Sequence, residues 1–159
     1  MTMLLEAKDP RNGNTVKFEA PDCTEDSIRD LLEFDFSDEE LRRRISTLDL
    51  SADAKSVLYT IAKVSVRAGS MIVRIGRKIL DGVMKIMAEF PSATSGTILG
   101  ATLGFLVSSI PFVGLVLGPI AAPLFAALGL VLGAKQDIRD KMLLRRIAEA
   151  NAAFDPLKT

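Results

Sequence analysis

The chain has 159 residues, with 20 basic and 20 acidic side chains, no net charge and 48% hydrophobic residues. This length suits one domain, or one small domain beside a membrane segment. The sequence has no His and no Trp, and its only Cys is Cys23. This composition excludes imidazole catalysis, Cys/His zinc sites and a disulfide framework.

The charges are unevenly distributed along the chain. Residues 1–55 carry 14 acidic and 8 basic side chains, residues 56–90 carry 2 and 6, and residues 91–134 carry none. Different parts of the chain should therefore meet different partners. We expect four segments: an acidic β-hairpin and two-helix head over 1–50, a basic amphipathic helix over 51–90, an uncharged helical hairpin over 91–134, and a charged C-terminal helix and tail over 135–159.

The acidic head is predicted to begin with a β-hairpin and to continue with two short helices. Residues 3–7 and 15–19 have the character of strands, and the loop between them holds Pro10 and the pair Asn12-Gly13. Thr24 can cap a helix over residues 25–34. Ser37 forms a capping box with Glu40, which predicts a second helix that ends near residue 48.

Residues 56–90 contain no proline and predict one long helix, with Ser51 as a cap before it. At 100° per residue, basic side chains fall on one side and apolar side chains on the other. This pattern is typical of a surface helix packed on a core, or of a helix that lies on anionic lipid. We expect a lipid-facing basic stripe of five side chains: Lys63, Arg67, Arg74, Lys78 and Lys85.

The uncharged tract predicts two apolar helices, over residues 93–110 and 112–134, with the turn at Pro111. At 1.5 Å per residue they would measure about 27 and 34 Å, close to the ~30 Å hydrocarbon thickness of a bilayer. The positive-inside tendency would keep both termini on the cytoplasmic side. Pro119 and Pro123 should either kink the second helix or delay its start.

Small residues recur at helical spacing along both arms of this tract. Such residues let two helix backbones approach closely, so the arms should pack on each other or on further copies. The predicted helix-packing positions are Gly96, Gly100, Gly104, Gly114, Gly118, Gly129 and Gly133. Alternatively, the tract could be the buried centre of a helical domain.

The order of these segments resembles the pore-forming domain of colicins. The residues that carry the resemblance are the uncharged stretch from Gly96 to Gly133 and the charged run from Lys135 to Lys141 that follows it. The resemblance implies a hairpin that is sheathed in a helical bundle, inserts spontaneously and depolarises a membrane.

No residue pattern predicts catalytic, cofactor-binding or metal-binding residues, and we do not expect an enzyme. The glycines of the uncharged tract have helical spacing and do not form a phosphate-binding loop. The run Arg42-Arg43-Arg44 follows three acidic residues, which favours a solvated helix face over a nucleic-acid site.

These observations predict a mainly α protein of the membrane that oligomerises with itself and permeabilises a bilayer of anionic lipid. The opposite charges of the head and the long helix suggest that the head masks the basic side until a regulatory protein displaces it. Two alternatives stay open. The hairpin could be only the anchor of a membrane-bound interaction or scaffold protein, or it could be buried in a soluble oligomer.

Overall fold

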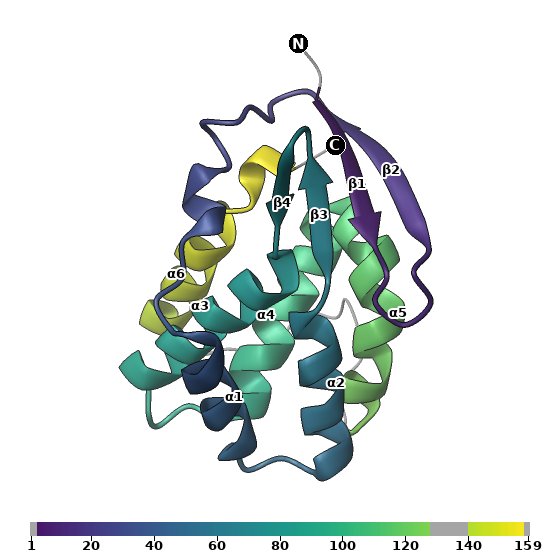
Figure 1. The fold of residues 1–159 in the computed structure, drawn as a ribbon. Coiled ribbons are helices and arrows are strands. Elements are labelled where there is room, and N and C mark those ends of the chain that lie inside the picture. The colour runs from purple at the N-terminus through teal and green to yellow at the C-terminus, as the bar shows by residue number, and fades with distance from the viewer. Residues whose placement is uncertain (1–2, 128–139, 158–159) are drawn as a thin grey trace.

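The computed structural model describes residues 3–127 and 140–157, which form helices packed against one face of a small antiparallel sheet (Figure 1). The sheet has the strand order β2-β1-β3-β4. Its strands are β1 (Met3–Lys8), β2 (Thr15–Ala20), β3 (Ser65–Ala68) and β4 (Met71–Val73). The predicted mainly α fold with an N-terminal β-hairpin is therefore confirmed.

The helices of the described residues follow the strands in two groups. Before the second pair of strands lie η1 (Arg29–Leu32), α1 (Asp38–Ser46) and α2 (Ala52–Ala62), and after it lie α3 (Ile75–Glu89), α4 (Ser95–Ser109), α5 (Pro111–Ala127), α6 (Lys141–Ala152) and η2 (Asp155–Leu157). The predicted caps of α1 and α2 are confirmed, because Ser37 Oγ accepts from Glu40 N at 3.1 Å and Ser51 Oγ accepts from Ala54 N at 3.1 Å.

The predicted single helix over residues 56–90 is wrong, because a β-hairpin interrupts it. Strands β3 and β4 pair with Ala68 opposite Met71, so that Gly69 and Ser70 form a two-residue turn. Gly69 has a φ of 63°, which suits the first position of a type II′ turn. The chain reverses there, and α2 and α3 pack side by side instead of forming one rod.

The predicted helix over residues 25–34 is also shorter than expected. Thr24 Oγ1 accepts from Ser27 N, and Ser27 Oγ donates to Thr24 O. These bonds have the pattern of a helix cap, but residues 25–28 form only turns, and the short η1 follows. Its role is to bury Leu31, next to Ile28, in the core.

The predicted transmembrane hairpin is wrong as well. Among residues 3–127 and 140–157, no helix has both the length and the apolar character needed to cross a bilayer. Helix α4 has 15 residues, below the ~20 that a bilayer requires. The predicted location in a membrane, with both termini on the cytoplasmic side, is not supported either, because it required such a helix.

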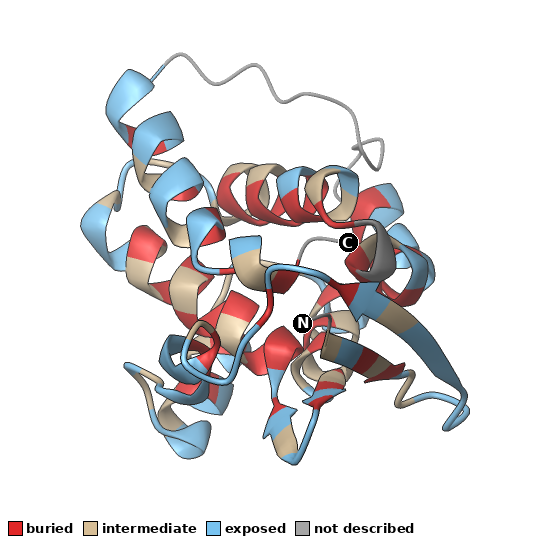
Figure 2. Ribbon diagram, turned by 90° about the horizontal axis from the view of Figure 1, so that it is seen from above, coloured by how far each residue is buried: buried red, intermediate tan, exposed pale blue. Residues whose placement is uncertain are grey.

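The apolar side chains of α4 and α5 are accounted for by the protein core. Helix α4 contacts α3, α5 and α6, while α5 contacts α2 and the strands β1 and β2. One cluster of buried side chains includes Leu5 of the sheet, Leu58 of α2, Leu103 of α4 and Ile147 of α6. In Figure 2 the buried segments gather where the helices and the sheet face each other.

The small residues of the tract lie at several depths in this packing. Gly100, Gly104 and Gly118 are buried, and Gly96 is half-buried in the first turn of α4. A Cβ added to Gly114 would lie 2.8 Å from the carbonyl oxygen of Val107 in α4, so this glycine permits a close contact between the two helices. The predicted packing positions Gly129 and Gly133 lie outside the described residues.

Pro111, Pro119 and Pro123 all belong to α5. The helix begins at Pro111, where the turn was expected, and runs without interruption through Pro119 and Pro123. Both internal prolines are exposed, as is Leu115 at 61%. The carbonyl groups that lose their amide partners belong to Leu115 and Pro119, on this outer side, where water can hydrate them.

The contact between α2 and α3 depends on Gly76. The Gly76 amide donates to the Val64 carbonyl at 3.1 Å, and a Cβ at this position would overlap the carbonyl oxygen of Ile61. Gly76→Ala should therefore lower the free energy of unfolding by about 1–3 kcal/mol, as overpacking does. Chemical denaturation of the purified protein measures this difference.

The matched control is Gly82→Ala in the same helix. A Cβ at Gly82 meets no atom within 4 Å, so this substitution should raise the free energy of unfolding by up to about 1 kcal/mol through helix propensity. Equal stabilities of the two variants would contradict the close approach at Gly76.

Candidate functional site

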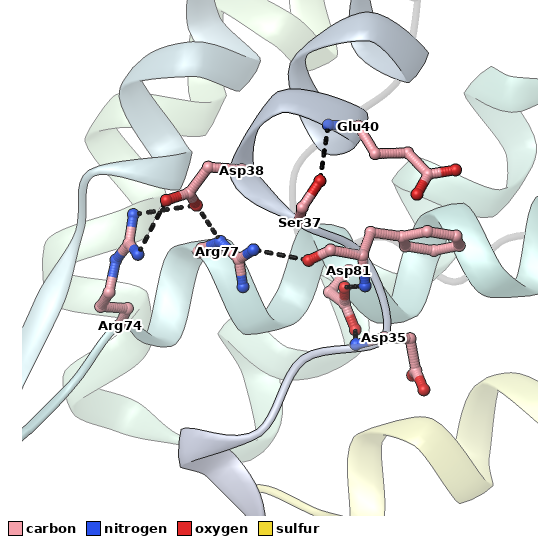
Figure 3. A network of polar contacts seen from close by, with 8 residues as sticks. Asp35, Ser37, Asp38, Glu40, Arg74, Arg77 and Asp81 are labelled. Carbon is pink, nitrogen blue, oxygen red and sulfur yellow. Dashed lines mark hydrogen bonds and ion pairs between the residues drawn. The ribbon is translucent and has the colours of Figure 1, made fainter.

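The candidate site forms where residues 33–38, which we call the acidic segment, lie against α3. The side chain of Asp81 in α3 is buried, at 1% exposure, and accepts hydrogen bonds from the backbone amides of Asp35 at 3.0 Å and Phe36 at 2.9 Å (Figure 3). A buried carboxylate requires such donors, because isolated burial of its charge is very costly. Asp81 therefore fixes the path of the acidic segment.

Arg77, one turn earlier in α3, holds the same segment through three contacts. Its Nη2 donates to the carbonyl of Phe36 at 2.6 Å, and its Nε donates to Asp38 Oδ1. Its guanidinium also lies 3.6 Å from the centre of the Phe34 ring, a cation–π contact. The Arg77 side chain is only 4% exposed, so these contacts replace the water that it loses.

Three further cations of α3 and the residue before it contact the acidic segment from outside. Arg74 pairs with Asp38 at 3.3 Å, Lys85 pairs with Asp35 at 3.5 Å, and Lys78 donates to the carbonyl of Glu33. Figure 3 shows Arg77 of α3 and Arg74, the residue before this helix, converging on Asp38 at the start of α1. In this structure the acidic segment thus covers part of the basic side of α3.

A cavity of about 380 Å³, which we call the basic cavity, opens beside Arg77 between α1, α2 and the start of α3. Its charged lining residues are Arg42, Lys63, Arg74, Arg77 and the single carboxylate Asp38, and the remainder are Leu41, Ile45, Tyr59 and Ala62. Four cations and one anion leave this cavity with an excess of positive charge.

Several donors of the basic cavity have no acceptor within the described part of the chain. The guanidinium of Arg42 and the ammonium of Lys63 make no hydrogen bond or ion pair there, and Arg77 Nη1 is buried without an acceptor. The Tyr59 hydroxyl donates to the carbonyl of Arg42 at 3.4 Å, which ties α2 to α1 at the rim. The cavity therefore offers positive charge that the protein itself does not neutralise.

The pKa of Asp38 lies below its usual value. The main cause is the hydrogen bond from Arg77, and the bond from Arg74 acts in the same direction. Asp38 is consequently ionised near neutral pH, when both arginines hold it. The balance of charge in the basic cavity stays positive under these conditions.

The five residues of the predicted basic stripe do not form one face, because the chain reverses between Lys63 and Arg74. Lys63 caps α2 and lines the basic cavity, while Arg67 lies in β3 opposite Glu6 of β1. The other three, Arg74, Lys78 and Lys85, contact the acidic segment.

The sequence did not single out Arg77 or Asp81, and it assigned Arg42 to a solvated helix face; Tyr59, as the lone tyrosine, had suggested a membrane or partner interface. Arg77 and Asp81 are four residues apart in one helix. Opposite charges at this spacing usually form an exposed ion pair on the helix surface. The structure instead buries both and gives each a separate backbone partner. Only the position of the acidic segment, which is distant in sequence, distinguishes the two arrangements.

The described residues show no arrangement typical of metal-assisted or thiol chemistry. Within residues 3–127 and 140–157, no group of three or more Cys, Asp or Glu side chains could hold a metal ion. Cys23 is buried, and burial raises the pKa of its thiol, which disfavours a reactive thiolate. That the protein is not an enzyme stays a prediction.

Comparison with known proteins adds no assignment. No protein-family model, curated protein or solved structure matches this chain. The resemblance to pore-forming colicins therefore stays a prediction.

Acidification should destabilise the protein through Asp38. Because the folded state lowers the pKa of this carboxyl below 3.8, its ion pairs stabilise the fold above that value and are lost as the pH falls through the lower folded pKa. Asp38→Asn removes the titrating group. The stability difference between the wild type and this variant should therefore be largest above about pH 5 and shrink toward about pH 2.

Denaturant titrations across this pH range measure the difference. Asp22→Asn is the control, because Asp22 is exposed and makes no ion pair among the described residues. A difference between the wild type and Asp38→Asn that stays constant down to about pH 2 would show that the pair with Arg77 does not stabilise the fold.

Proposed function

We propose that the protein is a non-enzymatic interaction protein that binds an anionic group of its partner in the basic cavity. The observation that carries this proposal is the set of four cationic side chains around one cavity with a single carboxylate. Two of these cations, Arg42 and Lys63, come from different helices and have no anionic partner in the described part of the chain. Their convergence gives a bound anion contacts from both sides.

The residue types in the cavity favour an oxyanion such as a phosphate or carboxylate group. Guanidinium groups present paired donors in a plane that match two oxygens of such a group. Arg77 already binds the carboxylate of Asp38 through Nε alone, while its Nη2 donates to the carbonyl of Phe36. Lys63 adds a point charge from the end of α2.

The apolar part of the lining indicates how the rest of the partner is held. Leu41, Ile45 and Ala62 belong to the cavity together with the cations. A mostly apolar surface with a few placed polar groups is typical of a binding cavity. The partner should therefore present its anion next to an apolar group, as a phosphorylated or acidic peptide with a neighbouring hydrophobic side chain does.

The test is binding of pyrophosphate, a small polyanion, to the full chain and to the double variant Arg42→Glu plus Lys63→Glu. Binding is measured by isothermal titration calorimetry at about 0.15 M ionic strength. Salt at this concentration screens weak long-range attraction between the protein and the anion. Since a charge-assisted hydrogen bond contributes about 1.5–3 kcal/mol, the double variant should bind pyrophosphate at least about tenfold more weakly.

The control with the same change of net charge is Arg43→Glu plus Arg67→Glu. Arg43 lies on the exposed side of α1, and Arg67 lies on the outer face of the sheet, away from the cavity lining. This control should bind pyrophosphate as the wild type does. An equal loss in both double variants, or no measurable binding by the wild type, would overturn the proposal.

The predicted regulatory protein and the predicted homo-oligomer stay predictions. The acidic segment is adjacent to the basic cavity through Asp38, so a partner that binds there would meet both features. Self-association has one favourable feature, which is the exposed uncharged side of α5 around Leu115.

A further inference from the structure

A second feature that favours self-association, besides the exposed side of α5, is the edge of the sheet that β2 forms. Among the described residues only β1 pairs with β2, and the strand lies at the outer margin of the molecule in Figure 1. The backbone groups on the open side of an edge strand are a template for a further strand. The residues of β2 therefore determine which strand can be added.

The bond that closes the first β-hairpin shows which backbone groups of β2 face this open edge. The amide of Asp9 donates to the carbonyl of Asn14 at 2.9 Å, so these residues form a hydrogen-bonded pair of the antiparallel ladder. Bonded and non-bonded pairs alternate, and the register makes Ala7 and Val16 the next bonded pair. Every second residue of β2 from Val16 onward thus bonds to β1. The residues whose amides and carbonyls face outward are Thr15, Lys17 and Glu19.

These three outward-facing residues are available to a further strand. Their side chains are exposed, and within residues 3–127 and 140–157 no hydrogen bond or ion pair reaches them from outside the sheet. Lys17 and Glu19 carry opposite charges on the same face of the strand. A complementary strand must therefore present these two charges in the reverse order.

A second copy of β2 presents the reverse order when it runs antiparallel, as a twofold axis requires. Outward-facing residues must lie opposite each other, so the axis passes through one residue of the strand. When that residue is Phe18, Lys17 of each copy lies opposite Glu19 of the other. An axis at Lys17 or at Glu19 would instead place like charges opposite each other, which destabilises a sheet.

The charges on the neighbouring strands agree with the register centred on Phe18. On the outer face of the sheet, Lys17 lies opposite Glu6 of β1, and Glu6 lies opposite Arg67 of β3. Glu19 of a second copy, placed beside Lys17, continues this row with alternating sign. Cross-strand pairs of opposite charge stabilise a sheet.

The same register covers apolar side chains on the inner face of the sheet. Phe18 lies opposite the buried Leu5, so it belongs to this face, and it is half-buried. Val16, on the same face, is still 38% exposed. Across the axis Phe18 meets Phe18 of the second copy at a non-bonded position, where side chains approach most closely, and Val16 meets Ala20. A second copy thus removes apolar surface that one copy leaves at the edge.

We propose that two copies of this protein pair through β2, antiparallel and centred on Phe18, to form one continuous sheet. Edge strands of this length bury less than the ~1,200 Å² that is typical of stable complexes. The dimer is therefore weak, with an expected dissociation constant between about 10 µM and about 1 mM.

Sedimentation equilibrium of the full chain, at concentrations up to about 1 mM, measures this constant. Lys17→Glu makes both facing pairs of the dimer carboxylate against carboxylate, and Glu19→Lys makes both ammonium against ammonium. Each variant should dimerise at least about fivefold more weakly than the wild type, because both pairs become repulsive at once. A mixture of the two variants should dimerise more tightly than either alone, since each pair of the mixed dimer joins opposite charges.

The control with the same change of net charge is Lys8→Glu. Lys8 is exposed in β1, one strand away from the proposed contact, so this variant should dimerise as the wild type does. Amide hydrogen exchange gives a second measurement. The amides of Lys17 and Glu19 should exchange more slowly as the wild-type concentration rises, and this dependence should be weaker in Lys17→Glu.

Three outcomes would overturn the proposal. A monomer at every concentration would leave the edge to water or to a strand of another protein. A dimer that Lys17→Glu weakens no more than Lys8→Glu does, or a mixture no tighter than its separate variants, would exclude this register. None of these outcomes bears on pyrophosphate binding, because neither Lys17 nor Glu19 lines the basic cavity.

Discussion

The contact between the Asp81 carboxylate and the backbone amides of Asp35 and Phe36 determines how the N-terminal region joins the helices. Burial of a carboxylate is costly unless donors surround it, so α3 can pack inside the protein only while the acidic segment lies across it. Two cavities border α3 near this contact. Arg77 borders the basic cavity, and Asp81 itself borders a smaller cavity between α3, α4 and α6. A change that loosened the acidic segment would therefore alter both.

Local signals in the sequence predicted the parts of the fold that depend on neighbouring residues. The first β-hairpin and the caps at Ser37 and Ser51 were predictable, because turn residues and capping hydroxyls act within a few positions. The second β-hairpin was missed, although Gly69-Ser70 lies between two runs of β-branched residues, because the helical period of residues 56–90 matched as well. Two short strands offered too few alternating positions to outweigh it.

The environment of the apolar tract and the composition of the candidate site depend on contacts between segments that are distant in the sequence. The lack of charge over residues 91–134 is consistent with a bilayer or with a protein interior, and the short α4 and the buried side chains of α4 and α5 in one core cluster favour the interior. Of the predicted basic stripe, Lys63 and Arg74 line the basic cavity, but Arg42 and Arg77 join them only because α1 and α3 meet in the fold. The pattern of charges along one helix carries no information on such a meeting.

The measurement that tests this account most directly is native-state hydrogen exchange at the amides of Asp35 and Phe36, in the wild type and in Asp81→Ala. The account predicts that the wild-type amides exchange roughly 100-fold more slowly than those of the exposed loop around Asn12, and that Asp81→Ala removes most of this protection. The amides at the centre of α4 should keep theirs. Rapid exchange at Asp35 and Phe36 in the wild type would contradict the central role given to Asp81.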